Sequence, residues 1–381
     1  MNLLELFEKL IAFNTESKLS NREMTDFICS LLYSIGFEKD KVLVTSLQSG
    51  ENAEKCNIVA IKGDGPDGLM LAGHMDTVSP EPYKQWKTDP FVLTRKKDRL
   101  YGLGATDMKL FLATAIKVAE EFPAGSLKHP LALVFTHDEE TSMIGAKHLK
   151  KEGLLQARYG IVGEPTRLVP VRLHKGWLGA EVIIHGRAGH GSDPKEGHNA
   201  IELAHKFLSR LFVFRDDLKD FNNPILKPSY PTLNVGVIQG GREPNKIPGE
   251  CRIELEIRPI PGQDLTDIIN DLKQIAEEME EIDGQKIATI KLTSAPIDPM
   301  ETLAGSLVVR VAEKITAKEA IGVSYNTEAT LFNSAGVETI VLGPGNIVQA
   351  HQPNEFVTDM YLDATVETLR NIITEICTER R

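Results

Sequence analysis

The chain has 381 residues, of which 41% are hydrophobic and 25% are charged, as is typical of a globular protein with a packed core. Acidic residues outnumber basic ones by 54 to 43, and the net charge of -11 argues against a basic surface that binds DNA or RNA. No apolar run approaches the roughly 20 residues of a membrane-spanning helix. Residues 1–18 show an amphipathic pattern in place of the basic start and apolar block of a signal peptide. We therefore expect a cytoplasmic protein that binds neither nucleic acid nor membranes.

Length and cysteine content set two further limits. A single hydrophobic core rarely grows beyond about 250–300 residues, so we expect more than one domain. The four cysteines form no Cys-x-x-Cys pair, which agrees with a reducing compartment and gives no sign of a zinc ribbon or a thioredoxin-like motif.

The first third of the chain alternates helix and strand patterns. Apolar residues at helical spacing predict helices over 3–11, 21–35 and 109–120. Short apolar runs predict strands at 57–61, 69–72, 131–135, 161–162 and, later in the chain, 339–342. These runs are continuously apolar, so we expect strands buried on both faces, in a mostly parallel α/β sheet with helices between the strands.

The middle of the chain has a different pattern. Residues 179–185, 232–238 and 252–258 partly alternate apolar and polar side chains, as in a sheet with one face in water. Helical patterns lie beside them at about 199–213 and 264–281. We therefore predict an α+β insertion over 178–294, an antiparallel sheet with two helices on one side. The first domain would comprise 1–177 and 295–381, with helices at 302–317 and 359–378.

Histidines and acids follow the predicted strands. They are His74 and Asp76 after 69–72, Asp138, Glu139 and Glu140 after 131–135, Glu164 after 161–162, and His351 after 339–342, with Asp107 just before the helix at 109–120. Sites in open α/β sheets form beyond the carboxyl ends of the strands, so these segments could converge at one edge. Imidazole and carboxylate groups are ligands suited to zinc, cobalt or manganese.

Each local motif also has a plainer interpretation. His74 could bind a metal while Asp76 accepts its other ring N–H, although a chance His-x-Asp in a surface loop is the alternative. One acid of 138–140 could bind a metal while a neighbour takes a proton from water, although a solvated acidic loop is the alternative. A helix opening near Thr141 would favour these acids.

Two glycine-rich segments are less specific. Gly102-x-Gly104 lacks the third glycine of a dinucleotide loop and the Gly-Lys-Ser/Thr of a phosphate loop, so it more simply lets the backbone turn to present Asp107. His190 lies in a glycine-rich loop, which alone is weak support for a function.

Together the motifs resemble the two-metal, zinc-dependent aminoacylase and exopeptidase family, from about residue 55 to 357. They are AGHMDTVSP at 72–80, KTDPF at 87–91, YGLGATDMK at 101–109, HDEETSMIGAKHL at 137–149, VGEPTRLVPVRLHKG at 162–176, GRAGHGSDPKEGHNAIEL at 186–203, YPTLNVGVIQGG at 230–241, IRPIPG at 257–262, YNTEA at 325–329 and LGPGNIVQAHQPNEF at 342–356. So many motifs in the right order are specific to the family, and they are similar to its acetylornithine deacetylase subgroup.

The resemblance implies a zinc-exopeptidase-like catalytic domain and an inserted domain that serves as lid and dimerisation domain. It implies two divalent metal ions, zinc or else cobalt, and a cis peptide bond after Asp107. The implied metal ligands are His74, Asp107 as the bridge, Glu140, Glu164 and His351. The resemblance also implies that Glu139 is the general base and that Asp76 orients His74. It implies a catalytic role for His190, which the lid brings to the site, often from the partner subunit. Asn245 and Arg258 would bind the substrate.

The implied reaction is hydrolysis of N2-acetyl-L-ornithine to L-ornithine and acetate, by a water that the metal ions activate and Glu139 deprotonates. His190 would stabilise the developing oxyanion and Arg258 would bind the substrate α-carboxylate. Glu328, in the YNTEA motif, is a hypothetical partner for the substrate's side-chain amine; a structural acid at a helix start is the alternative. The same machinery would also suit a succinyl-diaminopimelate desuccinylase, another N-acyl-amino-acid deacylase or a dipeptidase. An alternative from a different functional class is a non-catalytic scaffold that kept the fold.

Overall fold

The computed structural model describes residues 1–49, 53–279, 281 and 284–378. The chain divides into two compact units, and each is described by itself. The first unit comprises Met1–Arg172, Glu301–Ile321 and Thr327–Arg381, and the second comprises Leu173–Met300 and Gly322–Asn326. The second unit thus includes the segment 322–326, which the predicted insertion at 178–294 did not contain.

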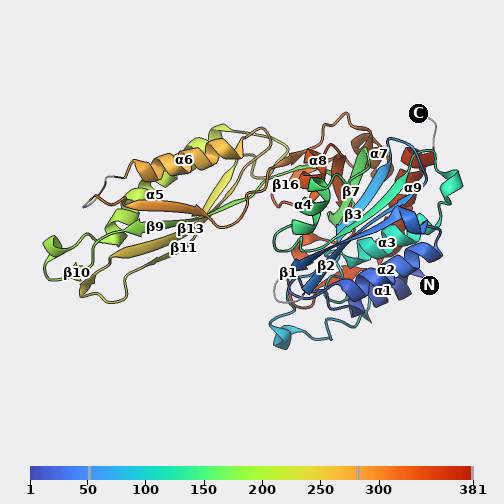
Figure 1. The fold of residues 1–381 in the computed structure, drawn as a ribbon, viewed down its shortest axis with the longest axis horizontal. Helices are drawn as coiled ribbons and strands as arrows, with labels where there is room; N and C mark the ends of the chain where they lie inside the picture. The colour runs from blue at the N-terminus through green and yellow to red at the C-terminus, as the bar shows by residue number, and fades with distance from the viewer. Residues whose placement is uncertain (50–52, 280, 282–283, 379–381) are drawn as a thin grey trace. The chain divides into compact units, whose positions relative to one another are not determined.

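A nine-stranded mixed sheet forms the centre of the first unit (Figure 1), and its strands β8, β15 and β16 each include residues that are assigned to the second unit. Its strands are β1 (Val42–Ser49), β2 (Ala53–Lys62), β3 (Leu69–His74), β6 (Leu131–Thr136), β7 (Tyr159–Pro165), β8 (Val171–His174), β15 (Met300–Glu301), β16 (Ile321–Val323) and β17 (Glu338–Gly343). The order is β1-β2-β6-β3-β7-β17-β8-β15, and β16 pairs with β8. Pairing is parallel between β6, β3, β7 and β17 and antiparallel at β1–β2, β2–β6 and β17–β8. The expected mostly parallel sheet is therefore confirmed at its centre, whereas β2 runs antiparallel.

Helices cover both faces of this sheet. They are α1 (Leu3–Ala12), α2 (Arg22–Ser34), α3 (Lys109–Glu120), α4 (Ile144–Lys151), α7 (Leu307–Thr316), α8 (Ala329–Ser334) and α9 (Met360–Ile373). Leu69 and Leu71 of β3 pack into the large core formed with α1, α2, α3, α7 and α9. The intervening Met70 and Ala72 are also fully buried, so the strand is covered on both faces, as its continuous apolar run predicted. Within the described residues, no helix is long and apolar enough to cross a membrane.

Two predicted helices of the first unit begin later than expected. The helix expected from Thr302 begins at Leu307, because Met300–Glu301 form β15 and the Thr302 N–H continues the sheet by donating to the Arg172 carbonyl. The helix expected near Thr141 begins at Ile144, because Met143 takes a left-handed conformation with φ of 53° and the chain turns before the first helical residue.

A small sheet, which the sequence patterns did not predict, lies beside the loop that carries Asp107. It contains β4 (Thr94–Lys96), β5 (Arg99–Tyr101) and β18 (Phe356–Thr358), in the order β18-β5-β4. Phe356 of β18 is the register partner of Tyr101 in β5. This pairing brings residues 102–107, which follow β5, next to Glu355, which precedes β18.

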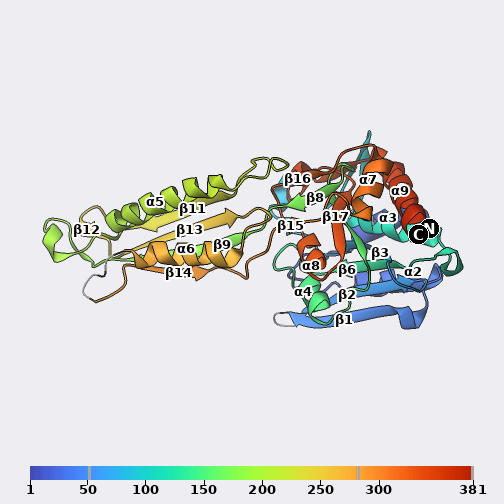
Figure 2. The same cartoon turned by 90° about the horizontal axis from the view of Figure 1, so that it is seen from above.

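The second unit contains a four-stranded antiparallel sheet with two helices on one face (Figure 2). Its strands, in spatial order, are β11 (Thr232–Gly240), β13 (Glu250–Arg258), β9 (Leu178–His185) and β14 (Ala288–Leu292), and its helices are α5 (Ala200–Asp217) and α6 (Leu265–Glu277). Alternate residues of β9 and β13, such as the register partners Val182 and Ile253, pack in one core with both helices. The helix expected over 264–281 ends at Glu277, and residue 280 lies outside the described part of the chain.

A separate pair of short strands completes the second unit. It joins β10 (Gly189–His190) to β12 (Lys246–Ile247) in antiparallel register, with His190 opposite Lys246.

Candidate metal centre

Four parallel strands of the first unit bring candidate ligands to one edge of the sheet. His74 is the last residue of β3, Glu164 lies at the end of β7, Glu139 and Glu140 follow β6, and His351 follows β17. Because these strands are parallel, their carboxyl ends lie at the same edge. Asp107 joins this edge from the loop between β5 and α3.

The first ligand group consists of His74, Asp107 and Glu164, all buried. Nε2 of His74 lies 3.0 Å from Oδ1 of Asp107 and 3.5 Å from Oε1 of Glu164. One ligand atom from each residue lies within 4.8 Å of the others, as three ligands of one ion would.

The second group consists of Asp107, Glu140 and His351. Nε2 of His351 lies 2.8 Å from Oε2 of Glu140 and 3.3 Å from Oδ2 of Asp107. Asp107 therefore turns one carboxylate oxygen to each group, the arrangement of a bridging ligand. The peptide bond after Asp107 is cis, as the resemblance implied.

Asp76 contacts the site differently from our expectation. Nδ1 of His74 lies 2.9 Å from the main-chain carbonyl of Asp76 but 3.6 Å from its carboxylate. The carboxylate instead accepts the main-chain N–H groups of Glu139, at 3.1 Å, and Glu140, at 3.3 Å. Asp76 thus holds the ring of His74 through its backbone and the Glu139–Glu140 segment through its side chain.

Glu355 supports the site, although we expected no role for it from the sequence. Its buried carboxylate accepts the main-chain N–H groups of Gly104, Thr106 and Asp107, at 2.8, 2.7 and 3.0 Å. Gly104 has a φ of 76°, which confirms the sharp turn that we expected the glycines to allow. The signal for Glu355 was its place in the NEF end of the last motif, four residues after His351.

The charges at this edge favour bound cations. Burial, together with the charge of Glu164, raises the pKa of Glu139 well above its usual value. Burial and the charge of Asp107 raise the pKa of Glu164 to about 8. Hydrogen bonds to Asp107 and Glu140 raise the pKa of His351 to about 11. Buried carboxylates this close need positive charge, and imidazole and carboxylate donors that converge on it suit divalent ions.

Asp138 and Glu328 belong to neither ligand group. Asp138 pairs with the buried Lys55, at 3.0 Å, so the three consecutive acids do not share one role. Glu328 is fully buried at the start of α8, and its Oε2 accepts the hydroxyl of Thr136 at 2.7 Å. Oε1 of Glu328 has no hydrogen-bond partner among the described residues, and burial raises the pKa of this group to about 7.

His190, Asn245 and Arg258 belong to the second unit. The N–H of Gly191 donates to the carbonyl of Asn245 at 2.8 Å, so β10 and β12 bring His190 and Asn245 close together. Nδ1 of the exposed His190 lies 2.7 Å from Oγ of Ser192. Arg258 lies at the end of β13 and pairs with Glu256 at 3.2 Å.

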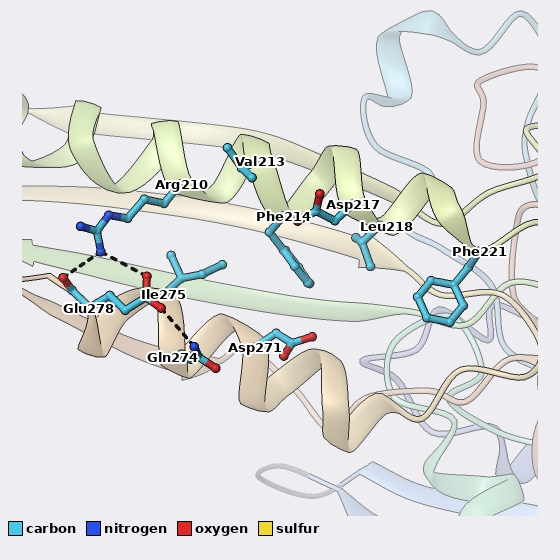
Figure 3. Close-up of a pocket in the computed structure, with 10 residues that line it drawn as sticks. All are labelled: Arg210, Val213, Phe214, Asp217, Leu218, Phe221, Asp271, Gln274, Ile275 and Glu278. Atoms are coloured by element: carbon cyan, nitrogen blue, oxygen red, sulfur yellow. Dashed lines mark hydrogen bonds and ion pairs between the residues drawn. The ribbon is translucent and has the colours of Figure 1, made fainter.

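A groove in the second unit lies between α5 and α6 (Figure 3). Its apolar lining residues are Val213, Phe214, Leu218, Phe221 and Ile275, and its polar or charged ones are Arg210, Asp217, Asp271, Gln274 and Glu278. Nη1 of Arg210 donates to the carbonyl of Glu278 at 2.8 Å and thereby links the two helices. Neither candidate ligand group lies in this groove.

Comparison with known proteins places this chain in a family. The sequence model of peptidase family M20/M25/M40 matches residues 70–375. An acetylornithine deacetylase of Proteus mirabilis (strain HI4320) is 38% identical over 98% of this chain and 96% of its own length. One of Pasteurella multocida (strain Pm70) is 37% identical over 99% and 98%. The crystal structure of a tripeptidase from Staphylococcus aureus subsp. aureus mu50 shares the fold, with a TM-score of 0.76 and 22% identity over 98% of this chain and 97% of its own. The chain therefore belongs to peptidase family M20/M25/M40.

Proposed function

We propose that the protein hydrolyses N2-acetyl-L-ornithine to L-ornithine and acetate. The observation that carries this proposal is the pair of ligand groups that share Asp107, with Glu139 beside them, in a chain 38% identical over nearly its full length to an acetylornithine deacetylase. The substrate is a small N-acyl amino acid, and the protein would work in the cytoplasm, which fractionation of cells would check.

The two ligand groups would hold two divalent ions, zinc or cobalt. His74 and Glu164 would bind one ion, Glu140 and His351 the other, and Asp107 both. Bound ions of this kind lower the pKa of a water from about 15.7 toward 7 and polarise a carbonyl oxygen. His74 keeps its orientation through the carbonyl of Asp76, and Asp107 keeps its own through the amides that Glu355 holds.

Glu139 would act as general base. It takes a proton from the attacking water and later gives it to the leaving α-amine. The base must be ionised at the start, although burial and Glu164 raise its pKa. Cations in the two ligand groups would favour its ionised form, so we propose that the base depends on occupied metal sites.

The second unit would supply groups that recognise the substrate. We propose that His190 and Asn245 stabilise the acyl oxygen as charge develops on it. Arg258 would bind the α-carboxylate. Nη1 of Arg258 has long contacts, at 3.5 Å, to the carbonyl of Ser324 and the side chain of Asn326. Because Glu256 already pairs with the other side of this guanidinium, Nη1 is the group that a substrate carboxylate would approach.

We also propose that the protein is a homodimer through this second unit and that His190 acts in the partner's site. A heterodimer of Glu139→Ala and His190→Ala subunits, purified with two different tags, tests both points. Each parent dimer should be nearly inactive, whereas the heterodimer should recover about half of the wild-type kcat, since one of its two sites is complete. A heterodimer as inactive as its parents would show that His190 serves its own subunit.

A substrate panel tests the proposed reaction. The wild-type protein should hydrolyse acetylornithine with a higher kcat/KM than succinyl-diaminopimelate, other N-acyl amino acids and dipeptides. Equal turnover of acetylornithine and succinyl-diaminopimelate would contradict the choice of substrate and favour the desuccinylase alternative.

Glu328 supplies a second arm of the same panel. We propose that its unpaired Oε1 accepts a hydrogen bond from the side-chain amine of ornithine. Glu328→Gln should then reduce the preference for acetylornithine over acetylnorvaline, which lacks that amine, by about tenfold or more, since hydrogen bonds to charged groups contribute about 1.5–3 kcal/mol. An unchanged preference would show that Glu328 is a structural acid at the start of α8.

A further inference from the structure

In the first unit, a closed ring of polar contacts joins Lys55 to the segment 138–140, which carries Glu139. Lys55, on β2, places its Nζ 3.0 Å from Oδ1 of Asp138 and donates a hydrogen bond to the carbonyl of Ser17. The hydroxyl of Ser17 donates to Oδ2 of Asp76 at 2.7 Å. Asp76 in turn accepts the N–H groups of Glu139 and Glu140, and the main chain returns from these to Asp138.

These contacts hold the segment 138–140, which contains an unfavourable backbone conformation at Asp138. Asp138 has a φ of 55°, in the left-handed region that side chains other than glycine adopt only occasionally. Its side chain is 6% exposed and that of Lys55 is 1% exposed, so each charge depends on the other in a medium where an unpaired ion is costly. Within the described residues, the other titratable side chain beside the Asp138 carboxylate is His137, whose Nδ1 lies 3.3 Å from Oδ2.

We propose that Lys55 is a positioning residue, which acts through Asp138 and Ser17 to aim Glu139 and Glu140 at the metal site. It anchors the segment through the carboxylate of Asp138, while Asp76 accepts the amides of Glu139 and Glu140. This inference rests on the proposed function, because it takes Glu139 as the base and Glu140 as a ligand. Among the contacts of the described residues, Lys55 reaches neither ligand group directly, so its effect would pass through Asp138 and, by way of Ser17, through Asp76.

Lys55→Met tests the proposal, with Lys62→Met as a matched control. Lys62 lies on the same strand, is 2% exposed, and donates to the carbonyls of Ile35 and Ala119 at 2.9 and 2.8 Å, away from the ligands. Both variants should lower the melting temperature. Only Lys55→Met should lower kcat by about tenfold or more with KM nearly unchanged. It should also weaken zinc binding by one of the two equivalents about 10–100-fold, the usual effect of residues that orient ligands.

A double variant separates positioning from simple charge neutralisation. Lys55→Met combined with Asp138→Asn removes both buried charges, and asparagine tolerates a left-handed φ. We expect the melting temperature to recover while kcat and the weakened zinc equivalent do not. Recovery of all three, or equal losses in Lys55→Met and Lys62→Met, would overturn the proposal.

The zinc titration also keeps this inference distinct from the proposed reaction, because it needs no substrate. If the wild-type protein binds two equivalents and Lys55→Met weakens one, the positioning role stands even where the substrate panel contradicts acetylornithine. If the panel supports acetylornithine and Lys55→Met binds both equivalents as tightly as the control, the positioning role is wrong and the reaction stands.

Discussion

Glu139→Ala is expected to lower kcat by at least about 10²-fold while the protein keeps its bound metal, because general-base catalysis usually contributes about 10²–10⁴-fold. Glu139 belongs to neither ligand group, so its removal leaves every candidate ligand in place. Its main-chain N–H would still donate to Asp76, so the segment that carries Glu140 should keep its position. The measurement is kcat with acetylornithine, together with metal content of the same sample.

Two companion variants make this result specific. Glu139→Gln has nearly the same shape but cannot accept a proton at neutral pH, so it should lose about as much activity as Glu139→Ala. Glu152→Ala removes an exposed acid just after α4 and should keep the wild-type rate. A Glu139→Ala protein with full kcat, or one that has lost its metal, would contradict the assignment of the base.

The central strands were predictable because burial on both faces leaves a plain mark in the sequence. Every residue of β3 and β6 is buried, and both appear as continuous apolar runs. The same property hid the direction of β2, since a run buried on both faces looks alike in parallel and antiparallel pairs. The edge strand β1 pairs only with β2 in the part of the chain that the structure describes, and it mixes exposed and buried residues, so its pattern gave no strand prediction.

The candidate ligands were predictable because they follow strands and belong to dense motifs. Their supports were not, since a contact such as Lys55 with Asp138 joins residues far apart in the sequence, and a single lysine in a strand carries no pattern of its own. Glu355 likewise meets the Asp107 loop only because β18 pairs with β5. Which atom of Asp76 meets His74 depends on backbone direction, which residue type alone does not reveal.

Removal of metal is expected to abolish activity, and zinc or cobalt should restore it. The chain supplies two groups of three candidate ligands, and Asp107 belongs to both groups. Reconstitution should therefore saturate at two equivalents of metal per subunit. The measurement is activity and metal content after dialysis against a chelator and after stepwise addition of each metal. Full activity in a protein shown to be free of metal would contradict the two-metal proposal.

Ligand variants turn this stoichiometry into a test of the bridge. His351→Ala removes a ligand from one group only, so it should weaken one equivalent and leave the other near its wild-type affinity. Asp107→Ala removes the carboxylate that gives one oxygen to each group, so it should weaken both. Equal behaviour of the two variants would mean that Asp107 serves one ion, whereas loss of both equivalents in Asp107→Ala alone is the result that a shared carboxylate requires.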